Sequence, residues 1–254
     1  MNTNTTGMTD FDFGSNFGFT GATIDDLGAT EYTLVTIALD ETGSINGFET
    51  QIRDMLTTTI DACKKSPHSN NLLVRVIRFG SQYKRQGGPG VDEIHGFKTL
   101  GEIDNASYPK LRGGGWTPLN DAVYSSVGAM NAYAKNLSDM DFGVNGITFV
   151  ITDGGENDST ASMKMVKDEI KKSVTGEVME SHVSVLIGID TGNGSVKTVL
   201  EKFQNEAGMD KFIWAGEATP GKLAKLADFV SQSISSTSQA LGTGGPSQTI
   251  SATI

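Results

Sequence analysis

The sequence is short of cysteine and of long apolar runs, and each shortage excludes a class of protein. Its 254 residues include one cysteine, Cys63, so neither an intrachain disulfide nor a zinc site built on several cysteines can form. No apolar stretch approaches the roughly 20 residues that a membrane-spanning helix needs. Residues 1–6 lack the basic and apolar segments of a secretory signal, so we expect a cytoplasmic protein.

Basic residues are also scarce. There are 20 lysines and arginines against 30 aspartates and glutamates, a net charge of −10. Such a surface repels phosphate backbones, which argues against nucleic acid as a partner; the simplest reason for the acidity is solubility. The length fits one large α/β domain or at most two small ones.

Apolar runs of strand length alternate with segments of helical spacing from residue 31 onward. The runs at 32–40 and 145–153 are nearly continuous and rich in β-branched residues, which is typical of strands buried on both faces. Further strands are expected at 71–79, 182–190 and 211–215, an edge strand at 93–100, and helices at 44–64, 118–137, 160–174, 195–206 and 220–236. This alternation predicts the α/β class: a Rossmann-like, doubly wound, mainly parallel six-stranded sheet with one short edge strand and helices on both faces.

The two ends of the chain differ from this pattern. Residues 1–30 are rich in glycine, threonine and asparagine, which argues for an arm rather than a domain. The arm also carries four phenylalanines, which are Phe11, Phe13, Phe17 and Phe19. Because these rings are costly to leave in water, we expect part of 10–20 to pack on the main domain or on a neighbour. The predicted division is an arm at 1–30, a domain at 31–236 and a Ser/Thr/Gly-rich tail at 237–254.

Three segments place oxygen-bearing side chains at the ends of predicted elements. Asp40, Thr42 and Ser44 follow the first buried strand, Thr117 precedes a helix, and Asp153 ends the strand at 145–153. Each alone has an ordinary explanation, in which hydroxyls cap helices and turn amides satisfy Asp40. Because ligands bind at the carboxyl ends of parallel strands near the switch in strand order, we expect all five to converge. Three glycines before Thr117 predict a loop that can move.

All five side chains are oxygen donors, which suits a hard cation: Mg²⁺, with Mn²⁺ or Ca²⁺ as substitutes. Two aspartates only balance the double charge of the ion, so it can still attract an outside carboxylate. Three more acidic residues lie close by in the sequence, and we interpret them as solvated loop carboxylates rather than groups that support the ligands. They are Glu41, Glu156 and Asp158.

The order D-x-[ST]-x-S, a distant threonine and a T-D-G aspartate resembles the metal-ion-dependent adhesion site (MIDAS) of von Willebrand factor A (vWA) domains. Asp40, Thr42 and Ser44 match the first part, Thr117 the second and Asp153 the third, within a resemblance that covers about 32–229. It implies the vWA fold and a protein partner whose Asp or Glu completes the coordination of the metal. The run Gly-Gly-x-Thr-Pro-Leu is most similar to bacterial tellurium-resistance TerY-type proteins, which implies a stress-response role.

Other functions remain open at this point. The chain could be an adaptor subunit of a MoxR-like AAA+ ATPase, or a structural component of a larger assembly tethered by the Phe-rich arm. A metal-dependent hydrolase is less favoured, because a haloacid-dehalogenase-type phosphatase needs an aspartate where Thr42 stands. Neither a G-x-x-x-x-G-K-[ST] loop nor a G-x-S-x-G elbow is present. We therefore expect a binding protein rather than an enzyme, of undetermined oligomeric state.

Overall fold

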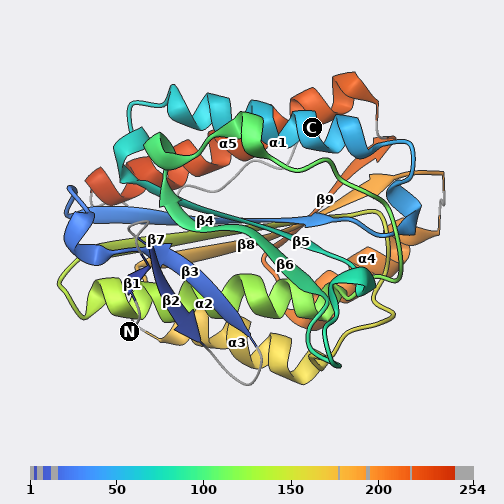
Figure 1. Ribbon diagram of the computed structural model, residues 1–254, viewed down its shortest axis with the longest axis horizontal. Helices are drawn as coiled ribbons and strands as arrows, with labels where there is room; N and C mark the ends of the chain where they lie inside the picture. The colour runs from blue at the N-terminus through green and yellow to red at the C-terminus, as the bar shows by residue number, and fades with distance from the viewer. Residues whose placement is uncertain are drawn as a thin grey trace.

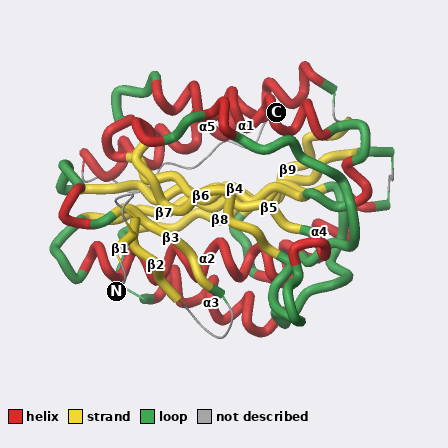
Figure 2. The backbone as a smooth tube through the Cα atoms, in the orientation of Figure 1, coloured by secondary structure: helices red, strands yellow, loops and turns green. Residues whose placement is uncertain are grey.

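The computed structural model describes residues 3–4, 8–12, 17–176, 178–192, 195–217 and 219–243. One twisted sheet lies between two layers of helices (Figure 1, Figure 2). The strand order is β1-β2-β3-β6-β5-β4-β7-β8-β9. No helix in these ranges is both long and apolar enough to cross a lipid bilayer.

The centre of the sheet is formed by β4 (Glu31–Asp40) and β7 (Gly143–Thr152), which pair in parallel. Three more strands run parallel to them: β5 (Leu72–Phe79), β8 (Ser181–Asp190) and β9 (Lys211–Glu217). The sixth, β6 (Val91–Thr99), is antiparallel to β5. The predicted doubly wound, mainly parallel α/β sheet is confirmed. The prediction of a short edge strand was wrong, because β6 has nine residues and β3 lies beyond it.

Helices cover both faces because the central strands are apolar on both sides. On one face, α1 (Glu49–Lys64) and α5 (Pro220–Thr243) pack on alternate residues of β4, such as Val35 and Ile37. On the other face lie α2 (Leu119–Ser138), α3 (Met163–Thr175) and α4 (Val196–Ala207), as Figure 1 shows. The alternation follows from the pleat, which turns successive side chains to opposite faces.

Two predicted helix boundaries differ from the structure by five residues or more. The first helix begins at Glu49 rather than at 44, because a 3-10 turn (Gly43–Ile45) and the left-handed backbone of Gly47 (φ +92°) come before it. The last helix continues to Thr243, past the predicted limit at 236. Its extension is anchored where the side-chain amide of Asn145 donates to the carbonyl oxygen of Thr237 at 3.2 Å. Residues 244–254 of the predicted tail lie outside the described residues.

The N-terminal arm adds three short strands to the six that were predicted. They are β1 (Thr3–Asn4), β2 (Met8–Asp12) and β3 (Gly18–Ala22), paired antiparallel with one another, and β3 lies beside β6. Phe17 and Phe19 are buried, and the ring of Phe11 stacks on that of Phe19 at 5.0 Å. The prediction that part of 10–20 packs is therefore confirmed. Phe13 lies outside the described residues, and the division into arm, domain and tail stays a prediction.

A buried arginine joins the arm to the rest of the sheet. Arg75 is 1% exposed, and its Nε lies 2.6 Å from Oε2 of Glu93. The other oxygen of Glu93 accepts hydrogen bonds from the backbone N–H of Thr20 at 2.9 Å and from its hydroxyl at 2.7 Å. On the helical side, the hydroxyl of Tyr133 donates to the carbonyl oxygen of Ala22 at 2.7 Å. Side-chain contacts therefore hold the arm where the β3–β6 pairing is brief.

Gly96 makes the close approach of the arm possible. A Cβ at this position would lie 1.9 Å from the carbonyl oxygen of Thr20. We expect Gly96→Ala to displace residues 18–22 and to lower the free energy of unfolding by about 1–3 kcal/mol, the usual cost of overpacking. Hydrogen exchange at 18–22 measures the displacement. Gly101→Ala is the matched control, since a Cβ there meets nothing within 4 Å, and equal protection in both variants would contradict the prediction.

Candidate metal centre

The candidate site lies where the strand order changes direction. From β4 the chain moves outward to β5 and β6, and it then returns to β7 on the opposite side of β4. Asp40 is the last residue of β4, and Asp153 comes directly after β7. Because the two strands are parallel neighbours, both carboxylates stand at the same edge of the sheet, and both are buried.

The structure brings the five predicted residues together. The hydroxyl of Ser44 donates to Oδ1 of Asp153 at 2.7 Å and lies 3.1 Å from the hydroxyl of Thr42. The hydroxyl of Thr117 donates to that of Thr42 at 3.5 Å, and the N–H of Thr42 donates to Oδ1 of Asp40 at 2.8 Å. A continuous network of polar contacts therefore joins two carboxylates and three hydroxyls from three separate segments.

The alternative explanation by helix capping does not hold for the hydroxyls. Thr42 occupies the residue before the 3-10 turn but makes no side-chain capping bond there. The residue before α2 is Pro118 rather than Thr117, and it has no capping side chain. The expectation that turn amides satisfy Asp40 is correct for one contact, because its carboxylate accepts from the backbone N–H of Thr42.

Two further threonines support the carboxylates and were missed in the sequence. The hydroxyl of Thr152 donates to Oδ2 of Asp40 at 2.5 Å, and that of Thr191 donates to Oδ2 of Asp153 at 2.6 Å. Thr191 follows β8, the strand next to β7. A hydroxyl directly after a parallel strand was the available signal, but the glycines after it resembled an ordinary turn.

The electrostatics of the site favour a cation. Burial, and then the negative charge of Asp153, raise the pKa of Asp40 from 3.8 to about 7. Burial likewise raises the pKa of Asp153. Within the described part of the chain, no ion pair joins either carboxylate to a lysine, arginine or histidine. Two buried carboxylates that share a site destabilise it unless a proton or a cation neutralises them.

The donor set fits a hard divalent ion better than a soft one. Across the described ranges, no cluster of three or more His, Cys, Asp or Glu side chains could hold a metal. The site instead offers two carboxylates and three hydroxyls, all oxygen ligands of the kind that Mg²⁺ binds together with water. That these five residues bind a metal stays a prediction.

Glu41 holds the loops of the site together. It is 1% exposed, and its carboxylate accepts from the hydroxyl of Tyr83 at 2.5 Å, from the backbone N–H of Arg112, and from a guanidinium nitrogen of Arg78 at 3.3 Å. Its carbonyl oxygen accepts from Gln82 at 2.7 Å. The interpretation of Glu41 as a solvated carboxylate was wrong, because the neighbouring loops enclose it.

The other two nearby acidic side chains also have partners. Glu156 accepts from the backbone N–H of Asn120, in the first turn of α2, at 2.6 Å and from the hydroxyl of Ser159 at 2.6 Å. Asp158 forms an ion pair with Lys84 at 3.1 Å. Both therefore fasten loops beside the site. Glu156 is not simply solvated, because its carboxylate is held by hydrogen bonds, whereas the side chain of Asp158 stays 33% exposed in its ion pair.

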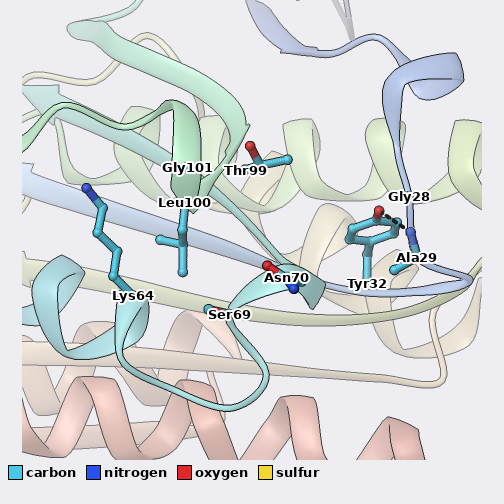
Figure 3. A pocket seen from close by; sticks show the side chains of 9 residues that line it. All are labelled: Gly28, Ala29, Tyr32, Lys64, Ser69, Asn70, Thr99, Leu100 and Gly101. Atoms are coloured by element: carbon cyan, nitrogen blue, oxygen red, sulfur yellow. Dashed lines mark hydrogen bonds between the residues drawn. The ribbon is translucent and has the colours of Figure 1, made fainter.

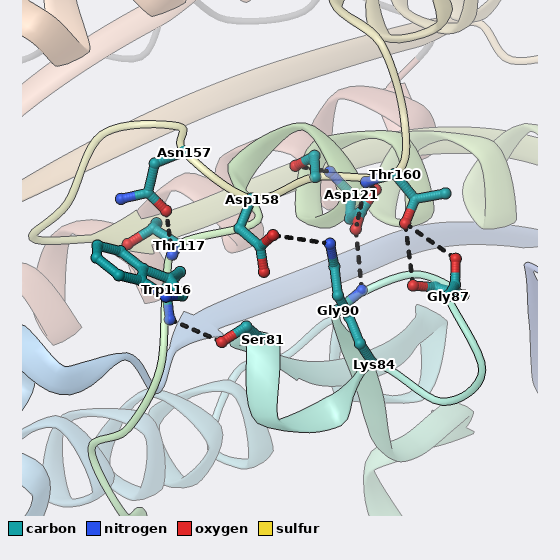
Figure 4. A network of polar contacts seen from close by, with 12 residues as sticks. Ser81, Lys84, Gly87, Gly90, Trp116, Thr117, Asp121, Asn157, Asp158 and Thr160 are labelled. Atoms are coloured by element: carbon teal, nitrogen blue, oxygen red, sulfur yellow. Dashed lines mark hydrogen bonds and ion pairs between the residues drawn. The ribbon is translucent and has the colours of Figure 1, made fainter.

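The segment that carries Thr117 is braced on both sides (Figure 4). The backbone N–H of Thr117 donates to Oδ1 of Asn157 at 2.7 Å, and the N–H of Asn157 donates to the carbonyl oxygen of Thr117 at 3.1 Å. Trp116 exchanges two similar bonds with Ser81, at 2.8 and 3.0 Å. Movement of this loop stays a prediction. The preceding glycines would allow it, but the movement would have to break these hydrogen bonds.

The raised pKa of Asp40 gives the site a definite pH dependence. Between pH 3.8 and about 7 the metal-free native state holds this proton more tightly than the unfolded chain, so the stability from this group is lost as the pH rises through 7. A metal competes with the same proton. We therefore expect stabilisation by Mg²⁺ to be small at pH 5.5 and full above pH 7.5, measured by melting with Mg²⁺ or chelator. An equal shift at both pH values would contradict this.

A cavity lies away from the candidate metal centre (Figure 3). Its volume is about 630 Å³, and it lies near Tyr32 at the opposite end of β4 from Asp40. Asp40 lies eight positions after Tyr32 along β4, which is roughly 26 Å at the usual rise of a strand. Lys64 is the charged side chain among the lining residues, and its Nζ donates to the carbonyl oxygen of Ile103 at 2.6 Å. The cavity therefore offers no second chemistry connected with the carboxylates.

Comparison with solved structures supports the fold of this chain and does not establish its function. The sequence matches no protein-family model and no curated protein. Among solved structures, the pilus adhesin SpaC of Lactobacillus rhamnosus GG has a TM-score of 0.59 and 11% identity over 93% of this chain and 33% of its own. Proximal thread matrix protein 1 of the mussel byssus has a TM-score of 0.53 and 19% identity over 79% of this chain and 47% of its own. This chain thus spans less than half of either relative. A second structure of the mussel protein, described as having a zinc-occupied MIDAS motif, has a TM-score of 0.50 and 17% identity over 80% of this chain and 48% of its own.

Proposed function

We propose that this chain is a divalent-metal-dependent protein-binding module in which an Asp or Glu of a protein partner completes the coordination of the metal. One observation carries the proposal. Two buried carboxylates, Asp40 and Asp153, meet at the switch in strand order with three hydroxyls around them, and no basic side chain among the described residues forms an ion pair with them. Binding of a cation relieves the electrostatic cost of the two buried charges. An incoming carboxylate can then bind the ion, because the two aspartates only just balance its charge.

In this proposal the two aspartates supply charge and the hydroxyls supply neutral ligands. Thr42, Ser44 and Thr117 leave the ion a strong electrophile, because they add no negative charge of their own. Mg²⁺ is the proposed metal, since every donor is oxygen. The zinc-occupied MIDAS of the mussel protein supports a divalent ion in this kind of fold.

The surroundings of two of the three histidines, His95 and His182, support a binding role rather than catalysis. Both ring nitrogens of His182 lie near hydroxyls, Ser173 at 2.7 Å and Thr148 at 3.1 Å, and those of His95 near Tyr108 at 3.0 Å and Gly96 at 2.9 Å. Burial lowers the pKa of His95 and that of His182 to about 4. These rings are occupied in the interior, which fits structural histidines.

The cellular setting is proposed from the sequence pattern. The run Gly-Gly-x-Thr-Pro-Leu followed by α2 supports a TerY-like, cytoplasmic stress-response protein. An adaptor of a MoxR-like ATPase would use the same site with a different partner. A component of a larger assembly would use the arm as well, and the contacts between Glu93 and Thr20 favour an arm that packs on its own chain.

The test is capture of a partner with and without the metal. Immobilised protein is incubated with extract of the source organism in Mg²⁺ or in chelator, and we expect specific capture only with Mg²⁺. Thr117→Val, which removes one hydroxyl and keeps the shape, should weaken capture about tenfold, which corresponds to about 1.4 kcal/mol, and should weaken Mg²⁺ binding less. Thr175→Val, on the exposed end of α3, is the matched control. Equal capture in chelator, or by Thr117→Val, would overturn the proposal.

A further inference from the structure

An exposed tryptophan stands beside the candidate metal centre. Trp116 directly precedes Thr117, and 67% of its surface is exposed, the largest fraction among the big exposed hydrophobic side chains of the described residues. An indole left in water forgoes a large gain from burial, so an exposed tryptophan on an ordered surface is typical of a binding anchor. In Figure 4 its ring projects from the loop beside Thr117, away from Lys84.

The backbone that carries this ring is fixed. Trp116 exchanges hydrogen bonds with Ser81 in both directions, and Gly115 before it has a left-handed φ of +71° with no room for a Cβ, which would lie 2.2 Å from the Ser81 hydroxyl. Thr117 after it is held in both directions by Asn157. A side chain presented on a braced backbone loses little entropy when it is covered, which favours its use in binding.

A second apolar side chain borders the site on the side of Asp153. Val199, in the first turn of α4, is 49% exposed and lies over Gly155, where a Cβ would come within 2.6 Å of one of its methyl carbons. Gly155 is two residues after Asp153. Trp116, on a loop, and Val199, in the first turn of α4, therefore flank the candidate metal centre, and each leaves apolar surface in contact with solvent.

The charges around the site limit the partner further. The chain carries 30 acidic and 20 basic residues, so a polyacidic segment is repelled as it approaches. Asp158 also lies close to the site, and its charge is already paired with Lys84. The ion attracts a single carboxylate, while the net charge of −10 disfavours further negative charges beside it.

We infer that Trp116 and Val199 form an apolar rim that selects a partner loop with one carboxylate directly beside a large apolar or aromatic side chain. The inference rests on the proposed function, because the carboxylate of the partner is the group that reaches the metal. The metal then requires an acidic residue in the partner. The apolar rim selects among acidic residues by the side chain that stands beside each of them. Polyacidic tails are poor partners for such a surface.

The test uses two small carboxylates that differ in one ring. Propionate and 3-phenylpropionate are titrated into the full chain with Mg²⁺, and affinity is read from NMR shifts of the amides of Thr117 and Gly154. We expect phenylpropionate to bind about tenfold more tightly, as burial of part of a phenyl ring predicts. Trp116→Ala should remove this preference, and Trp116→Phe should keep most of it.

Met140→Ala is the matched control. Met140 is also exposed, but it follows the far end of α2, about 30 Å from the site by the length of that helix. It should keep the full preference. Equal affinity for the two acids in the wild type, or a preference that survives in Trp116→Ala, overturns the inference while the proposed function stands. Failure of both acids to bind with Mg²⁺ present overturns the proposed function and the inference with it.

Discussion

Magnesium at a hundred times its dissociation constant is expected to raise the free energy of unfolding by about 2.7 kcal/mol, because a ligand that binds only the native state stabilises it by mass action. In a domain of this size that corresponds to roughly 5–10 °C in Tm. Asp40→Asn should abolish the shift, since it removes half of the charge at the site. Without metal, this variant should be at least as stable as the wild type above pH 7, because it lacks a buried carboxylate that resists ionisation. Calorimetry in Mg²⁺ or chelator measures both effects.

The control for this experiment is Asp158→Asn. Asp158 lies on a neighbouring loop and pairs with Lys84, so its loss should leave the Mg²⁺ shift intact. A wild-type protein that does not respond to millimolar Mg²⁺ at pH 8 would show that the two carboxylates are not a magnesium site. A full shift in Asp40→Asn would place the bound ion elsewhere.

Glu41→Ala should be the most destabilising single change near the site, at about 3 kcal/mol. Removing one partner of a buried ionic cluster costs about 3–5 kcal/mol, and the lower end applies because the guanidinium of Arg78 is partly exposed. The hydroxyl of Tyr83 and the N–H of Arg112 also lose their acceptor. Since these contacts tie together the loops around Thr42 and Gly114, Mg²⁺ affinity should fall as well. Denaturant unfolding and a Mg²⁺ titration measure the two quantities.

Glu41→Gln separates charge from hydrogen bonding. Its carbonyl oxygen can still accept from Tyr83 or from the N–H of Arg112, so we expect about half of the loss. A cost below 1 kcal/mol for Glu41→Ala would mean that the loops are held without this carboxylate. An unchanged Mg²⁺ affinity would mean that it does not help to position Asp40 and Thr42.

The fold could be predicted because its signals are local. Buried parallel strands such as β4 and β7 are continuous apolar runs, and helical spacing between them leaves few topologies. The convergence of Asp40 and Asp153 followed from the same rule, since the ends of neighbouring parallel strands must meet. The boundary of α1 was missed because the 3-10 turn before it keeps apolar residues, such as Ile45, at helical spacing.

Other features depend on contacts between segments far apart in the sequence. Glu41 looks like a loop carboxylate until Tyr83 and Arg112 close over it. The three strands of the arm could not be assigned, because their glycines and polar residues resemble a loop. They become strands because β6 and Tyr133 offer them a place to pack. The burial of Glu41 and of the arm depends on the folded chain as a whole, and no local sequence pattern predicts it.

The docked arm also imposes an order on folding during synthesis. Phe19 is made early, but Tyr133, on which it packs, is made 114 residues later. At roughly 5–20 residues per second, roughly 6–23 seconds pass between the synthesis of Phe19 and that of Tyr133. The hairpin therefore cannot complete its packing before α2 has been made, and the glycines of β3, Gly18 and Gly21, keep it a weak template for aggregation during that interval.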